Sequence, residues 1–272
     1  MKNQPTLTYI GGPTVLIEWD GVRFLTDPTF DPAGSQSTTG PVTLKKFEGP
    51  ALNADALGKV DVVLLSHDHH YDNLDDAGRA LLPGVGRVLT TREGAHRLSG
   101  NVVGLDIWQS VHVTAPSGGS FTITATPCRH GPAGLDRGPV CGFVLSYSEA
   151  ADLKVYVSGD TVWYDGVAEV AKRFNIQIAV LFMGAARVPV VADAPLTMTA
   201  ADGIEAARAF PHATIVPLHY EGWAHFSESR EVIAEAFARA GLNERLFWLP
   251  KAKSTVVPIT GATQIAAPKG AR

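Results

Sequence analysis

The feature that most constrains the fold of this chain is an apolar run that stops at a cluster of imidazole and carboxylate side chains. Residues 60–65 (VDVVLL) are almost continuously apolar, which is typical of a β-strand buried on both faces. The residues that follow, 66–73 (SHDHHYDN), hold three of the nine histidines of the chain. Proteins of the α/β class often place their chemistry on the rigid end of such a strand. This segment therefore predicts one part of a metal centre at a sheet edge.

Three further strand-like segments end in residues of the same kind. His130 follows residues 121–126, Asp160 follows residues 153–157, and His219 follows residues 213–216. Neutral imidazole and carboxylate groups are ligands that suit Zn²⁺, Mn²⁺ or Fe²⁺. These positions are spread over more than half of the chain, so a shared metal centre requires a fold that gathers several strand ends.

Composition and charge exclude several classes of function. The chain has 272 residues, of which 45% are hydrophobic, and we predict a single domain over residues 1–272 with a frayed tail at 268–272. The net charge of −4, without a Lys/Arg run, argues against a nucleic-acid partner. No apolar run approaches the ~20 residues of a membrane span. Neither a leader sequence nor a disulfide framework is indicated, so we expect a cytoplasmic protein. A homo-oligomer is compatible with the sequence.

The order of the expected elements indicates an α/β fold. The N-terminal third contains short strands, and the last third alternates helices with strands, which predicts sheets covered by helices, with two sheets packed face to face as one arrangement. We expect a helix over residues 74–82 that is capped by Asp72 or Asn73. Residues 31–50 are rich in Gly, Pro, Ser and Thr and predict a long loop.

Several motifs together resemble one known family. Residues 66–75 (SHDHHYDNLD) are similar to the His-x-His-x-Asp-His signature of the metallo-β-lactamase superfamily, and the other segments occur in the superfamily's order: 126–131 (TPCRHG), 158–161 (SGDT) and 217–220 (PLHY). Residues 9–18 and 25–28 resemble the branch that includes L-ascorbate-6-phosphate lactonase and N-acyl-phosphatidylethanolamine phospholipase D. The resemblance covers roughly residues 6–250. It implies a four-layer αβ/βα sandwich of two mixed β-sheets flanked by helices.

The resemblance also implies one or two divalent metal ions, Zn²⁺ or Mn²⁺, with Fe²⁺ also compatible. The implied ligands of the first ion are His67, His69 or His70, and His130, while those of the second are Asp72 and His219, with Asp160 bridging the two ions.

The match departs from the signature at two points. The segment has one extra residue, so either His69 or His70 is its second histidine. We favour His70, because matching Asp72 to the aspartate of the signature keeps the start of the helix in place. Asn73 stands where the signature has its last histidine, and an amide is a poorer ligand than imidazole. We therefore expect the second metal site to be weaker, or to hold a harder metal such as Mn²⁺.

The function that the resemblance implies is that of a metal-dependent hydrolase. A metal-activated hydroxide would attack a small cytosolic substrate such as a lactone, an amide or a phosphodiester, and Asp72 would orient the hydroxide or take up its proton. We predict that His225, Trp163 and Trp223 bind the substrate, with core packing as the alternative. Asp27 either hydrogen-bonds near the metals or opens a turn. The altered position at Asn73 motivates a second hypothesis, a metal-binding module without hydrolytic activity.

Overall fold

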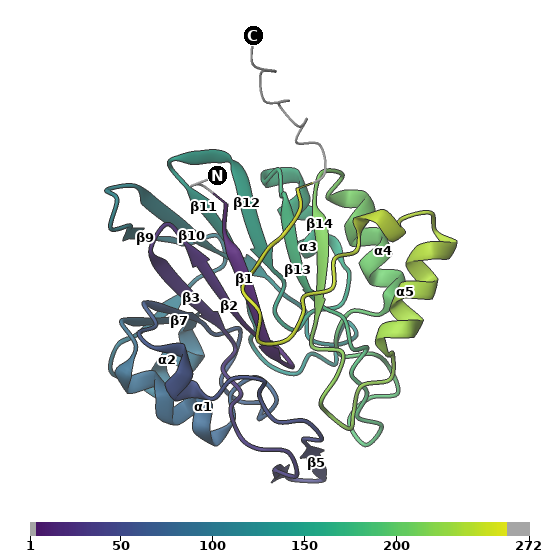
Figure 1. The fold of residues 1–272 in the computed structure, drawn as a ribbon. Coiled ribbons are helices and arrows are strands. Elements are labelled where there is room, and N and C mark those ends of the chain that lie inside the picture. The colour runs from purple at the N-terminus through teal and green to yellow at the C-terminus, as the bar shows by residue number, and fades with distance from the viewer. Residues whose placement is uncertain (1–3, 260–272) are drawn as a thin grey trace.

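Two β-sheets pack face to face, and helices lie on the outer side of each (Figure 1). This computed structural model describes residues 4–259, so the tail predicted at 268–272 lies outside the described residues. The predicted four-layer αβ/βα sandwich of two mixed sheets is confirmed by this arrangement. Within residues 4–259, no helix combines the length and the apolar character that crossing a bilayer requires.

The first sheet has seven strands in the described part of the chain, in the order β15-β1-β2-β3-β6-β7-β8. They are β1 (Thr6–Gly11), β2 (Thr14–Trp19), β3 (Val22–Thr26), β6 (Val62–Leu64), β7 (Arg87–Thr91), β8 (Val102–Leu105) and β15 (Thr255–Val256). The strands from β3 to β8 run parallel. Parallel neighbours need crossover connections, and helices α1 (Asp76–Leu81) and α2 (Arg92–Leu98) lie in two of them.

The second sheet has six described strands, in the order β14-β13-β12-β11-β10-β9. They are β9 (Ser110–Thr114), β10 (Ser120–Pro127), β11 (Cys141–Tyr147), β12 (Ala150–Val157), β13 (Ile178–Phe182) and β14 (Thr214–Leu218). Helices α3 (Asp165–Arg173) and α4 (Ala200–Ala209) connect its parallel strands, and α5 (Arg230–Arg239) follows β14. Short 3₁₀-helices occur at η1 (Ala54–Leu57), η2 (Leu82–Gly84) and η3 (Asn243–Arg245).

The main hydrophobic core lies between the two sheets. An aromatic cluster forms part of it: the rings of Phe121 and Tyr147 stack at 4.3 Å, and the centroids of Trp19 and Phe121 lie 5.3 Å apart in an edge contact. Burying each such side chain contributes ~1.5–3 kcal/mol. Phe121 lies at the start of β10, so this packing holds the sheets together at one end and leaves the opposite edge for polar side chains.

That opposite edge gathers the carboxyl ends of several strands. β10, β12 and β14 run in the same direction, because β11 is antiparallel to both β10 and β12, and β14 is parallel to β12 through β13. In the other sheet β3 and β6 are parallel and end at the same edge. A hydrogen bond from Cys141 N to Ser66 O (3.1 Å) joins the two sheets there.

The structure corrects two expectations about segments beside this edge. Residues 31–50 are not a structureless loop, because they contain the hairpin β4 (Gln36–Thr39) and β5 (Val42–Lys45). The predicted cap of the following helix, Asp72 or Asn73, is also wrong. Helix α1 begins at Asp76, and the Asp75 side chain caps it by accepting a hydrogen bond from Gly78 N at 2.8 Å. Asp72 and Asn73 are thereby left to face the site.

Candidate metal centre

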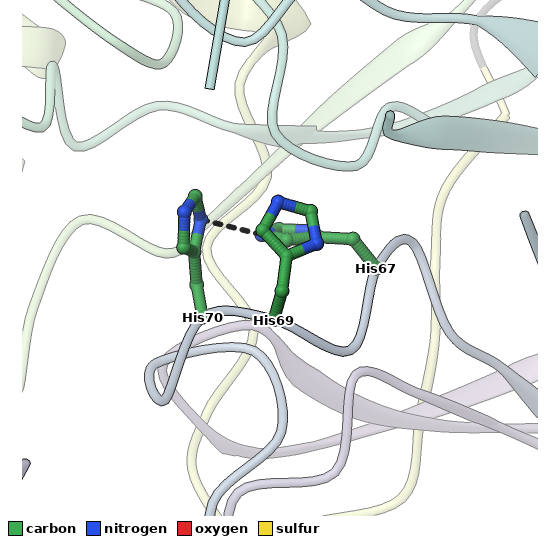
Figure 2. Close-up of side chains that lie close together, drawn as sticks. All are labelled: His67, His69 and His70. Carbon is green, nitrogen blue, oxygen red and sulfur yellow. Dashed lines mark hydrogen bonds between the residues drawn. The ribbon is translucent and has the colours of Figure 1, made fainter. Parts of the chain in front are cut away.

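Three imidazole nitrogens from two strand ends converge at the sheet edge. His70 Nδ1 lies 2.9 Å from His67 Nε2 and 3.1 Å from His130 Nε2. His67 and His70 come from the turn after β6 and face each other in Figure 2, whereas His130 follows β10. The structure thus brings together His70 and His130, which lie 60 positions apart in the sequence.

Hydrogen bonds on the far sides of two rings determine which nitrogen carries the proton. His130 Nδ1 donates to the carbonyl oxygen of Leu196 at 2.8 Å, so His130 Nε2 presents a lone pair. Ser66 Oγ donates to Asp27 Oδ1 at 2.6 Å and therefore accepts from His67 Nδ1 at 2.9 Å. His67 Nε2 consequently presents a lone pair to the same point as His130 Nε2.

One hydrogen on His70 Nδ1 can satisfy only one of these two lone pairs, whereas a divalent cation satisfies all three nitrogens. Burial lowers the pKa of His130 to about 4, and it also holds the pKa values of His67 and His70 well below the ordinary histidine value. The three rings are therefore neutral at pH 7, which is the form that binds metal.

A second set of donors is formed by Asp72, Asp160 and His219. His219 Nε2 lies 3.3 Å from Asp72 Oδ2 and 3.6 Å from Asp160 Oδ1. The other oxygen of this carboxylate, Asp160 Oδ2, lies 3.6 Å from His130 Nε2. Asp160 thus faces both sets, as a bridging carboxylate must. His219 Nε2 is buried and makes no hydrogen bond within the described part of the chain, so it is available as a ligand.

The site buries three carboxyl groups. Asp27, Asp72 and Asp160 are at most 5% exposed, and no lysine or arginine among residues 4–259 forms an ion pair with them. Burial and the neighbouring carboxylates raise the pKa of Asp160 well above its usual value, and burial raises that of Asp27 to about 8. Burial acts in the same direction on Asp72, but His225 and His219 outweigh it and keep the pKa of Asp72 low.

Unpaired buried carboxylates are costly, and bound cations supply the missing positive charge. The imidazole lone pairs, the bridging carboxylate and the uncompensated charge together fit a site for divalent metal ions.

Backbone strain also marks this edge. Asp27 (φ 26°) and His219 (φ 54°) have positive φ angles, which non-glycine residues rarely adopt. Residues with such backbone conformations cluster at functional sites. Gly159, with φ 61°, precedes Asp160, and a Cβ atom there would lie 2.9 Å from the Cβ of Ser66. Glycine is therefore required for the turn that delivers Asp160.

His69 is placed differently from His70. Its Nε2 lies 2.7 Å from the carbonyl oxygen of Arg137, although one of its nitrogens is still within 4.8 Å of ligand atoms of His67 and His70. Figure 2 shows the His69 ring beside the pair that the dashed line joins. His69 therefore belongs to the wall of the site, and His70 to the convergent nitrogens.

A cavity of about 600 Å³ opens over the site. His70, Asp72, His130 and His225 line its floor, and His69 lies in its wall. The β4–β5 hairpin forms one side, and the loop at residues 186–196 forms another. Among the described residues that line it, neither Trp163 nor Trp223 occurs: Trp163 packs against the core outside the second sheet, and Trp223 lies under Lys46. A substrate-binding role for these two tryptophans stays a prediction.

Sequence reasoning missed the residues that support the site from behind. Ser66 and the carbonyl of Leu196 orient the imidazoles, and the buried Lys46 Nζ pairs with Asp75 Oδ2 at 2.9 Å. Asp75 also accepts from the backbone of Phe30 and Asp31, which fixes the start of the hairpin segment. Asp75 lies in the signature, but the sequence carries no signal that pairs it with Lys46.

A four-layer sandwich with histidine and aspartate donors at the sheet edge defines a class of metal-binding proteins, to which comparison with known families assigns this chain. A family model described as "Beta-lactamase superfamily domain" matches residues 22–220, and the chain belongs to the metallo-β-lactamase superfamily. The resemblance noted in the sequence is thereby confirmed.

Relatives support the same assignment. A UPF0173 metal-dependent hydrolase of Exiguobacterium is 26% identical over 247 residues, which cover 87% of this chain and 95% of the relative. N-acyl-phosphatidylethanolamine-hydrolyzing phospholipase D 1 of Caenorhabditis elegans is 41% identical over 69 residues, 25% of this chain and 18% of that protein. The crystal structure of an isothiocyanate hydrolase from Delia radicum gut bacteria has a TM-score of 0.77 and 25% identity, covering 92% and 98% of the two chains. The predicted enzyme class, metal-dependent hydrolase, is confirmed at this level.

Proposed function

We propose that this protein hydrolyses a small molecule with the help of one or two divalent metal ions, zinc or manganese. The observation that carries the proposal is the convergence of two donor sets on the shared carboxylate Asp160. His67, His70 and His130 would hold the first ion, and Asp72 and His219 would hold the second. A bound cation lowers the pKa of a coordinated water from ~15.7 toward ~7.

Asp72 has the properties of the group that receives the proton. Its low pKa keeps it ionised at neutral pH, and its side chain lines the floor of the cavity. A carboxylate at that position can orient an attacking water molecule and accept its proton. His67 and His130, held neutral by burial, keep their lone pairs for the metal and do not compete for that proton.

The cavity favours a small substrate with an apolar part. Val188, Val191 and Leu196 line one side, and Val42 and Leu44 of the hairpin line another. A volume of about 600 Å³ is in the range of sites for drug-sized molecules. We propose a lactone, an amide or a phosphodiester as the reactive group. An isothiocyanate is added because the structural relative named above carries that activity in its name.

We further propose a cytoplasmic enzyme that acts without nucleic acid, which agrees with its net charge of −4. A homo-oligomer remains part of the proposal, to be tested by light scattering.

The test is an assay of stripped and reconstituted protein. Protein treated with chelator is reloaded with Zn²⁺ or Mn²⁺ and assayed against lactones, amides, an activated phosphodiester and an isothiocyanate. We expect hydrolysis to disappear with chelator, to return with metal, and to fall at least 100-fold in Asp72→Ala, a loss typical of general-base removal. Asp152→Ala, at an exposed position in β12, is the matched control and should keep full activity.

A second candidate function is metal binding without hydrolysis. Asn73 favours this function, because its side-chain amide donates a hydrogen bond to Asp160 Oδ1 at 3.3 Å and adds no imidazole to the second donor set. Stoichiometric metal with no turnover on any compound of the panel would select this function over the hydrolase.

A further inference from the structure

The two donor sets are unequal. The first has three imidazole nitrogens, whereas Asp72, Asp160 and His219 supply the second set with one. Asn73 stands beside this set, but the atom that it turns toward Asp160 is its amide nitrogen. An amide NH₂ group donates hydrogen bonds and offers no lone pair to a cation. The second set therefore offers three protein donors, one of them the shared Asp160, and it has two imidazoles fewer than the first set.

A further imidazole lies next to this set. His225 Nε2 is 2.9 Å from Asp72 Oδ2, the same oxygen that lies 3.3 Å from His219 Nε2. These nitrogen–oxygen separations are similar to the nitrogen–nitrogen separations in the first set, 2.9 and 3.1 Å. The His225 side chain is 9% exposed and lines the cavity.

The loop after β14 holds His225 in this position. Its carbonyl oxygen accepts from Arg187 N at 2.8 Å, and the preceding residue, Ala224, donates to Lys45 O at 3.0 Å. The ring of Phe226 packs against both imidazoles, 4.6 Å from His225 and 4.7 Å from His219. In the described part of the chain His225 Nδ1 has no hydrogen-bond partner, so the one polar contact of the ring is directed at Asp72.

We propose that His225 is a ligand of the second metal ion and takes the place for an imidazole that Asn73 leaves open. The inference rests on the proposed function, since it takes the two donor sets as metal sites. It gives His225 a role different from the substrate contact expected from the sequence. It also removes the reason to regard the second site as impaired, because each site then has three ligands of its own besides the shared Asp160.

The test counts metal ions instead of turnover. Wild-type protein and variants are loaded with Zn²⁺, desalted and analysed by elemental mass spectrometry. We expect two ions per wild-type chain and one in His225→Ala. His225→Gln should also retain one ion, because glutamine can still donate a hydrogen bond to Asp72 but lacks the imidazole. His112→Ala, an exposed histidine in β9, is the control and should retain two ions.

A rescue variant separates loss of a ligand from loss of folding. Asn73→His combined with His225→Ala should restore the second ion, because it returns an imidazole to the same set from the other side. The inference is overturned if His225→Ala or His225→Gln keeps two ions, if Asn73→Ala alone loses the second ion while His225→Ala does not, or if the wild type holds one ion. In each of these cases the hydrolase proposal stands. Failure of the wild type to bind any ion would end both.

Discussion

His69 and His70 are neighbours in the sequence, but His70 alone presents a nitrogen to both His67 and His130. We predict that His70→Ala removes the first metal ion and reduces activity at least 100-fold. His69→Ala should keep both ions, because its Nε2 is engaged with the Arg137 carbonyl, and should alter KM instead. Metal content and steady-state kinetics of the two variants decide the point. Equal metal loss in both variants would contradict the assignment.

Ser66 acts on the metal centre through His67. Its hydroxyl donates to Asp27 and accepts from His67 Nδ1, which fixes the tautomer that turns the His67 Nε2 lone pair toward the site. Losing such a supporting contact typically weakens metal affinity 10–100-fold. We predict this loss for Ser66→Ala, measured by competition with a zinc chelator. Ser254→Ala, at an exposed position, should leave the affinity unchanged.

At the scale of elements, the β4–β5 hairpin forms a cavity wall without joining either main sheet. Its base is closed by Lys46 N donating to Ser35 O (2.9 Å), and Lys46 is tied to Asp75. Replacing residues 36–44 with a short glycine turn keeps Lys45, whose carbonyl oxygen accepts from Ala224 N in the loop that carries His225. The replacement should therefore preserve the fold and shift Tm by less than ~3 °C. We predict a KM increase of about tenfold or more with metal content unchanged. Loss of metal would show that the hairpin shapes the donor sets as well.

The same scale shows what the sequence could predict. The strand ends that bear His67, His130, Asp160 and His219 were predictable, because each apolar run stops at a ligand-type residue. The hairpin was not, because its exposed strands lack the apolar alternation that marks a half-buried strand. Asp75 as helix cap was missed because Asp72, Asn73 and Asp75 are all good caps. The contacts that fix Asp75 come from the distant residues Phe30, Asp31 and Lys46.

Contacts between distant segments set the rest of the site, and a single sequence does not encode them locally. The contact of His225 with Asp72 spans 153 positions, and that of Lys46 with Asp75 spans 29. The choice of His70 over His69 depends on where His130 lies, which is decided by the packing of one sheet on the other. Sequence reasoning therefore located the donors but left their pairing open.

For the whole molecule, burial of this site makes folding depend on pH in two opposing ways. Without metal, burial lowers the pKa of five imidazoles, so below about pH 6.5 the unfolded chain binds protons that the folded chain does not, and stability falls as pH falls. The five are His67, His69, His70, His130 and His219. Burial raises the pKa of Asp27, to about 8, and of Asp160. Those carboxyls keep protons in the folded state, so stability falls as pH rises toward 8.

Five imidazoles outweigh two carboxyls below about pH 6.5, and only the carboxyls act above it, so the metal-free protein should be most stable near pH 6.5. Urea denaturation of chelator-treated protein should show the free energy of unfolding decreasing by about 1–4 kcal/mol per pH unit on either side. Metal binding requires neutral imidazoles and ionised carboxylates, so saturating Zn²⁺ should move the maximum to higher pH. If the metal-free protein instead gains stability steadily up to pH 8, the buried carboxyls ionise without cost, and this edge has no uncompensated negative charge for a cation to neutralise.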